Sequence, residues 1–164
     1  MLHTAFIGLG SNLANPRQQV RQALQALGGL PHIKVLAASS LYCSKPIGFL
    51  QQPDFINAVA KVETELTPRA LLDTLLNMER ARGRTREFRN APRTLDLDIL
   101  LYDDLRYHEP GLTIPHPQMH LRAFVLRPLL EIAPDCTIPG VGPAADSALG
   151  CQEQQLEVIP NDNS

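Results

Sequence analysis

The chain has 164 residues, of which 44% are hydrophobic and 20% are charged, so it can bury a core as one domain spanning residues 1–164 without disulfides. Its net charge of −2 argues against a dedicated nucleic-acid binder, whose surface is usually strongly basic. No apolar run approaches the length of a membrane span, and the start, MLHTAFIGLGSN, lacks the features of a signal peptide. Three cysteines without metal-type spacing predict reduced thiols and a cytoplasmic protein.

The first half of the chain predicts a strand, a helix and a second strand. Residues 4–9 are a short apolar run typical of a buried strand, and GLGSN at 8–12 is expected to turn the chain toward a helix. Asn-Pro then precedes apolar residues at helical spacing, which predicts a helix over 16–27. Alternating apolar residues within 33–42 predict the second strand.

The second half repeats this order and then adds helices. Residues 55–62 predict a strand, a Thr-Pro start and a leucine stripe predict a helix over 68–82, and 95–101 predict another strand. Apolar patterns predict C-terminal helices at 122–132 and, more weakly, at 144–156. The order β-α-β-β-α-β predicts an α+β protein with a ferredoxin-like sheet and helices packed on both faces.

The stretch RTREFRNAPRTLDLDILL, residues 84–101, carries the main chemical signal. Its first part is an arginine-rich loop broken by Asn-Ala-Pro, and its second part alternates like a strand. Alternation puts Asp96 and Asp98 on one strand face, where two carboxylates can share a Mg²⁺ ion. Arginines match phosphate oxygens in geometry, so the stretch favours phosphoryl-type transfer. A half-exposed edge strand beside a solvated arginine loop is the alternative interpretation.

Other residues are weaker candidates when taken alone. Phe55 and Asn57 share a strand face, where they could stack on a flat heterocycle and bind its edge, although a core Phe and a turn-capping Asn are the better explanation of this pattern alone. Glu79 continues the apolar stripe of its helix and is either part of an ion pair or a site residue. His116 lies between two prolines that restrain its backbone, which makes it a fair site candidate.

Four segments, in chain order, carry a family resemblance: IGLGSN, SKPIG with QPDFINAV, APRTLDLDIL, and TIPHP with LRAFVLRPL. Together they resemble the 6-hydroxymethyl-7,8-dihydropterin pyrophosphokinase family over residues 7–135. The resemblance implies an enzyme of folate biosynthesis that transfers the β,γ-pyrophosphoryl group of ATP to the pterin hydroxymethyl oxygen and releases AMP. It also implies two Mg²⁺ ions held by Asp96 and Asp98.

The same resemblance implies roles for individual residues. Catalytic residues would be Arg84, Arg93, Asp96 and Asp98. Residues near ATP would be Glu79, Arg86, Arg89, Ile99, Thr113, His116 and Arg122. Residues around the pterin would be Ser44, Pro46, Ile47, Phe55, Asn57 and Phe124, with the ring between the two phenylalanines and Asn57 at its edge.

Two other functions remain open at this point. A Mg²⁺-dependent nucleotidyl or phosphoryl transferase acting on another acceptor would use the acidic pair without a pterin pocket. A non-catalytic ferredoxin-like module that binds a small ligand would need neither carboxylate. We expect a monomer whose partners are ATP and 6-hydroxymethyl-7,8-dihydropterin, with no nucleic-acid or membrane partner.

Overall fold

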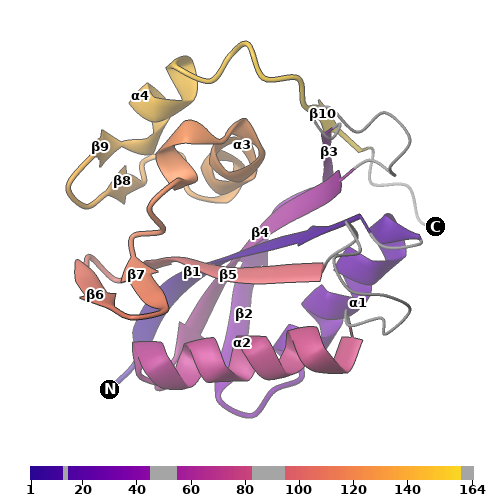
Figure 1. Ribbon diagram of the computed structural model, residues 1–164, viewed down its shortest axis with the longest axis vertical. Helices are drawn as coiled ribbons and strands as arrows, with labels where there is room; N and C mark the ends of the chain where they lie inside the picture. Colours follow the sequence, from indigo (N-terminus) through magenta and orange to yellow (C-terminus); the bar gives the residue numbers. More distant parts are fainter. Residues whose placement is uncertain (13–14, 45–54, 83–94, 160–164) are drawn as a thin grey trace.

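The computed structural model describes residues 1–12, 15–44, 55–82 and 95–159 of the chain. An antiparallel sheet lies between two layers of helices (Figure 1). The helices are α1 (Pro16–Gly28), α2 (Pro68–Arg82), α3 (Ala123–Ile132) and α4 (Ala144–Leu149), with a 3-10 turn at Met119–Leu121. The strands are β1 (His3–Ser11), β2 (Ile33–Ala38), β3 (Tyr42–Ser44), β4 (Phe55–Thr64), β5 (Leu95–Tyr102), β6 (Tyr107–Glu109), β7 (Leu112–Ile114), β8 (Thr137–Ile138), β9 (Gly142–Pro143) and β10 (Glu157–Val158).

The main sheet has six strands in the order β10-β3-β4-β1-β5, with β2 also paired to β4. The four strands β5-β1-β4-β2 are all antiparallel to their neighbours. Together with α1 and α2 they form the predicted βαββαβ arrangement. This confirms the ferredoxin-like prediction, including helices on both faces of the sheet (Figure 1).

The predicted strand over residues 33–42 is two strands, so that prediction was wrong in its extent. β4 has ten residues, and β2 pairs with its second half while β3 pairs with its first half. Ser39 lies at the break. Its N–H donates to the Val59 carbonyl (2.9 Å) and its Oγ accepts the Val59 N–H (2.9 Å). The hydroxyl thus replaces a main-chain partner where the chain changes direction.

Strand alternation divides the apolar residues between two cores. On one face, Ile7, Leu97 and Ala60 pack with Leu27 of α1 and Leu75 of α2, in what we call the α1/α2 core. On the other face, the α3/α4 core joins the sheet to α3 and α4. Its buried members include Val59, Leu100, Leu126, Leu129 and Ala144. Asp96 and Asp98, in the first half of β5, are exposed.

The helix ends agree with the sequence in part. The Thr67 hydroxyl accepts the Ala70 N–H (3.2 Å), which confirms a capped start for α2. Asn15 stands at the N-cap of α1 but has left-handed φ and ψ of 56° and 57° and makes no side-chain cap. The last helix, α4, ends at Leu149 rather than continuing to residue 156. None of the described helices is both long and apolar enough to cross a membrane.

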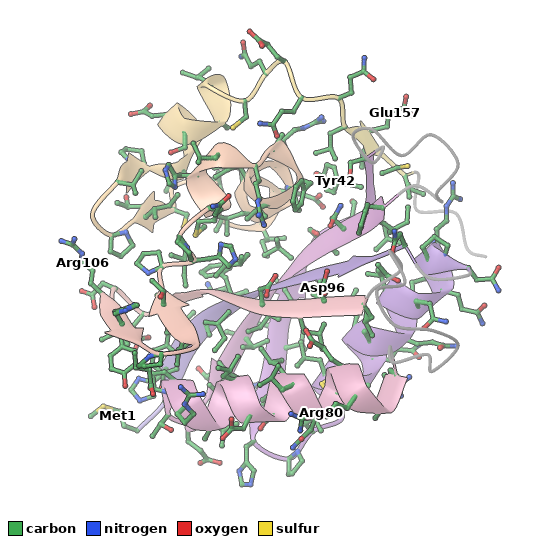
Figure 2. The ribbon with its side chains drawn as sticks, in the orientation of Figure 1. Met1, Tyr42, Arg80, Asp96, Arg106 and Glu157 are labelled. Atoms are coloured by element: carbon green, nitrogen blue, oxygen red, sulfur yellow. The ribbon has the colours of Figure 1, made fainter. Side chains whose placement is uncertain are left out.

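A carboxylate on α3 ties that helix to the edge of the sheet at β3. Glu131 accepts hydrogen bonds from the Tyr42 hydroxyl (2.6 Å), the Ser40 hydroxyl (2.9 Å) and the Ser40 N–H (3.0 Å). Figure 2 shows Tyr42 beside α3. Burial, followed by the hydrogen bond to Glu131, raises the pKa of Tyr42 to about 12. The Arg127 guanidinium lies 5.6 Å from the centre of the Tyr42 ring.

Removing this hydroxyl is expected to change alkaline stability. Between its usual pKa near 10 and the raised value of about 12, folded Tyr42 keeps its proton while the unfolded chain loses it. The stabilisation is therefore complete below pH 10 and is lost as pH rises toward 12. We expect Tyr42→Phe to lower the free energy of unfolding by about 1 kcal/mol at pH 8 and to flatten its decline above pH 10. Urea unfolding across this range measures both effects, and an unchanged alkaline slope would contradict the prediction.

Candidate active site

The exposed part of β5 presents two carboxylates side by side. Asp96 and Asp98 are exposed and alternate with the buried Leu95 and Leu97. Because the leucines lie in the α1/α2 core, both carboxylates are on the opposite face of the strand. Figure 2 shows Asp96 on the side of β5 away from α2. The predicted geometry of the acidic pair is therefore confirmed.

Two glycines form the neighbouring positions on β1. Gly10 lies opposite Asp96 on β5 and opposite Asn57 on β4, and Gly8 lies opposite Asp98. A Cβ built on Gly10 would be 2.6 Å from the Asn57 Oδ1 atom. The missing side chain at Gly10 is what allows the Asn57 carboxamide to lie across β1.

Sequence reasoning missed the role of Gly10. GLGSN was expected to form a turn, but β1 continues through Ser11, and Ser11 and Asn12 are fully buried. The signal was available in part: a glycine inside an apolar alternating run often marks a close approach of other groups to the backbone. The sequence could not say which group approaches, because Asn57 is 47 positions away along the chain.

Three predicted pterin residues lie where the end of β3 pairs with the start of β4: Ser44, Phe55 and Asn57. Ser44 pairs with Phe55 across the two strands, and the Asn57 Nδ2 atom donates to the Ser44 hydroxyl (3.3 Å). Asn57 is 6% exposed. A buried, hydrogen-bonded carboxamide has a fixed orientation, and Phe55 is half-buried beside it.

His116 lies near the charge of Asp98, and Arg122 lies near His116. The His116 N–H donates to the Leu100 carbonyl of β5 (2.9 Å), and its Nδ1 atom accepts the Gln118 N–H (3.1 Å). Burial lowers the pKa of His116, the Asp98 charge raises it and the Arg122 charge lowers it further. The imidazole is therefore close to both an anion and a cation. The Arg122 guanidinium also lies 5.5 Å from the centre of the Phe124 ring.

Glu79 contacts β5, the strand of the acidic pair, from α2. Its carboxylate accepts the Leu97 N–H at 2.7 Å, on the edge of β5 that has no strand partner among the described residues. Burial raises the pKa of Glu79, and the negative charges of Asp96 and Asp98 raise it further. The sequence left open an ion pair or a site role. The structure gives a carboxylate that caps a strand edge next to the acidic pair.

Removing this cap is expected to destabilise the protein. Glu79→Ala leaves the Leu97 N–H without its acceptor, so we expect the free energy of unfolding to fall by about 1–2 kcal/mol. Glu79→Gln keeps an oxygen acceptor and removes a charge next to two other carboxylates, so its loss should be less than half as large. Urea unfolding without divalent ions compares the two variants, and equal losses would contradict this role of the carboxylate.

Two other predicted site residues, Ile99 and Thr113, make their described side-chain contacts elsewhere. The side chain of Ile99 is buried in the α1/α2 core, so contact with a nucleotide would have to use its main-chain atoms. Thr113 lies in the β6–β7 hairpin, where its hydroxyl pairs with the His108 Nδ1 atom (2.9 Å). The remaining predicted residues lie outside the part of the chain that the structure describes: Pro46, Ile47, Arg84, Arg86, Arg89 and Arg93.

The donor set of the acidic pair fits a hard divalent cation. Within the described ranges no group of three or more His, Cys, Asp or Glu side chains could hold a metal, so Asp96 and Asp98 would supply two ligands. Magnesium is commonly bound by one or two carboxylates, with waters and substrate phosphates completing the shell. Exposure of both aspartates leaves room for such a shell.

Comparisons with known proteins identify the family of this chain. The profile of the 7,8-dihydro-6-hydroxymethylpterin-pyrophosphokinase family matches residues 6–134. A Pseudomonas aeruginosa protein named 2-amino-4-hydroxy-6-hydroxymethyldihydropteridine pyrophosphokinase is 43% identical over 160 residues, covering 98% of this chain and 99% of that protein. A Haemophilus influenzae protein of the same name is 52% identical over 136 residues, covering 83% and 85% of the two chains.

Solved structures support the fold. A Plasmodium falciparum HPPK-DHPS structure with pterin and p-hydroxybenzoate matches 97% of this chain with a TM-score of 0.75 at 13% identity. This chain spans 45% of that longer one, so the match concerns the fold of one part of it. With a family profile over most of its length and a relative 43% identical across nearly all of it, the chain belongs to the 7,8-dihydro-6-hydroxymethylpterin-pyrophosphokinase family.

Proposed function

We propose that this chain transfers the pyrophosphoryl group of ATP to the hydroxymethyl oxygen of 6-hydroxymethyl-7,8-dihydropterin, giving the pterin diphosphate and AMP in folate biosynthesis. Family membership supports the reaction. The observation that carries it in the structure is the exposed pair Asp96 and Asp98 on the same sheet face as the buried carboxamide of Asn57. The hydroxyl oxygen would attack the β-phosphorus as the bond from that phosphorus to the AMP oxygen breaks.

Asp96 and Asp98 would hold two Mg²⁺ ions together with the ATP phosphates. When bound, magnesium would neutralise triphosphate charge and lower the pKa of the attacking hydroxyl. No side chain in the described part of the chain is an obvious general base for this hydroxyl. The residues therefore act mainly by holding the two substrates in line and by stabilising charge.

The pterin would lie between Phe55 and Phe124, with Asn57 at its ring edge. Support comes from the half-buried aromatic rings and from the hydrogen bond that orients the Asn57 carboxamide toward Ser44. Proteins commonly bind a flat heterocycle by stacking an aromatic ring on its face and by hydrogen-bonding an amide group to its edge. Pro46 and Ile47 would complete this pocket.

ATP would lie on the side of the acidic pair where His116 and Arg122 are found. The His116 imidazole, which lies near the charges of both Asp98 and Arg122, and the Arg122 guanidinium suit phosphate oxygens that are also bound to metal. Thr113, Glu79 and the main chain of Ile99 would lie near the nucleoside. Arg84, Arg86, Arg89 and Arg93 would clamp the phosphates.

We infer that residues 1–164 form one domain and that the protein works as a monomer in the cytoplasm. All three cysteines, Cys43, Cys136 and Cys151, are thiols rather than disulfides. That state suits a reducing compartment.

Release of AMP from ATP and Mg²⁺, with and without the pterin, tests the function. AMP that forms only when the pterin is present would support it, and its absence would reject it. A transferase acting on another acceptor is the rival. It predicts that Phe55→Ala leaves activity on that acceptor intact, whereas our proposal predicts a large rise in the KM for the pterin.

A further inference from the structure

The segment after α4 contacts both the start of α3 and the edge of the sheet. Gln154 reaches the residues just before and within the first turn of α3. The Leu156 carbonyl accepts a hydrogen bond from Arg127 of α3 (2.8 Å). β10 pairs with β3, and the buried Ile159 donates its N–H to the Leu41 carbonyl (2.8 Å). Residues 154–159 therefore connect the helix that bears Phe124 with the strand that bears Ser44.

The Gln154 carboxamide forms two hydrogen bonds around a single residue, Arg122. Its Oε1 atom accepts the Ala123 N–H (2.8 Å), and its Nε2 atom donates to the Leu121 carbonyl (2.8 Å). Arg122 is extended, with φ −124° and ψ 112°, so these two flanking main-chain groups point to the same side. The carboxamide thus bonds to Arg122 as a neighbouring residue does in a parallel sheet.

The Gln154 carboxamide accepts a main-chain N–H at the start of α3, where the N-cap residue, Arg122, provides no side-chain cap. Arg122 makes no side-chain cap on α3, and arginine is not among the residues that cap well. The Ala123 N–H is one of the helix-start groups without an intrahelical partner, and Gln154 satisfies it. The Arg122 guanidinium lies over the Phe124 ring instead of turning back to the backbone.

Gln154 is itself held by its own segment. Its N–H donates to the Cys151 carbonyl (3.0 Å), and Cys151 is 5% exposed, with its Sγ atom 3.8 Å from the His120 carbonyl. Gln154 also lies beyond residue 134, where the family match ends. The contact is therefore a feature of this chain's C-terminal segment.

We propose that Gln154 is a positioning residue, which fixes the main chain of Arg122 so that its guanidinium meets the phosphates of ATP. The inference rests on the proposed function, in which Arg122 contacts ATP. Without the two hydrogen bonds from Gln154, Arg122 could rotate about its φ and ψ angles. The guanidinium would then sample many positions, and ordering it on binding would weaken affinity.

The test is a double-mutant cycle with Mg²⁺ and α,β-methylene-ATP, whose bridging carbon blocks transfer. Calorimetry would give the dissociation constant for wild type, Gln154→Ala, Arg122→Ala and the double variant. We expect each single variant to bind about tenfold more weakly. The double variant should bind no more weakly than Arg122→Ala, because Gln154 acts through Arg122. Gln152→Ala and Gln155→Ala, at exposed glutamines of the same segment, should match wild type.

Three results would overturn the proposal. These are wild-type binding by Gln154→Ala, wild-type binding by Arg122→Ala, or a further loss in the double variant equal to that in the wild-type background. The last result would make Gln154 a helix cap with a general structural role. If Gln154→Ala does not fold, Gln154→Glu keeps the acceptor for Ala123 and replaces the donor to Leu121 by a charged oxygen that the Leu121 carbonyl repels, and the same cycle applies. AMP formation by wild type tests the proposed function separately, since this binding assay contains no pterin.

Discussion

Asp98→Asn is expected to reduce pterin-dependent AMP formation by about a thousandfold or more, because it removes one of two carboxylates that would hold the metal. Asparagine keeps the size of the side chain and one oxygen, so the change tests charge and not packing. Asp98 is exposed on β5, and its replacement should leave the free energy of unfolding nearly unchanged. The kcat, measured at saturating ATP, pterin and Mg²⁺, reports the effect.

Asp104→Asn is the matched control for this prediction. Asp104 is exposed in the turn that follows β5, so its replacement removes the same charge close by in sequence but away from the acidic pair. It should keep wild-type kcat. If Asp98→Asn kept more than a tenth of the wild-type kcat, the metal-binding role would be rejected.

Gly10→Ala is expected to raise the KM for the pterin by up to about a hundredfold, since leaving a buried polar group without its hydrogen-bond partner costs about 1–3 kcal/mol. The added Cβ would lie 2.6 Å from the Asn57 Oδ1 atom, a distance that forces the carboxamide to move. Asn57 would then lose its orientation toward Ser44. The KM for ATP should change much less, because the strain arises at the β4 side of β1.

Gly8→Ala is the control on the same strand face. Its Cβ would meet the Leu100 side chain at 3.3 Å, and a flexible leucine can yield by a few tenths of an ångström. We expect nearly wild-type KM values for both substrates. Adding Gly10→Ala to Asn57→Ala should cost little more than Asn57→Ala alone. A large additional loss would mean that Gly10 acts by another route.

Much of the fold follows from patterns within short stretches of sequence. The alternation in LDLDILL predicted that Asp96 and Asp98 share a face, and the structure confirms it. The Thr-Pro start of α2 and the leucine stripe behind it also agree with the structure. These features depend on the two- and 3.6-residue periods of the backbone, which neighbouring residues set among themselves.

Other features depend on contacts between distant residues. The split of residues 33–42 into β2 and β3 depends on pairing with β4 and on Ser39 meeting Val59. The continuation of β1 through Gly10 depends on β4 and β5 flanking it. A turn-forming composition predicted otherwise, because local propensity is overridden where a strand has partners on both sides.

By itself, the sequence determined the βαββαβ order of the main elements, the family resemblance and the shared face of the acidic pair, since each of these depends on residue type and spacing along the chain. Only the tertiary structure decided which groups meet: Glu79 with the Leu97 N–H, Asn57 across Gly10, and Gln154 around Arg122. These contacts join residues 18 to 47 positions apart. Their geometry arises from the packing of the sheet between two helical layers, which no local pattern encodes.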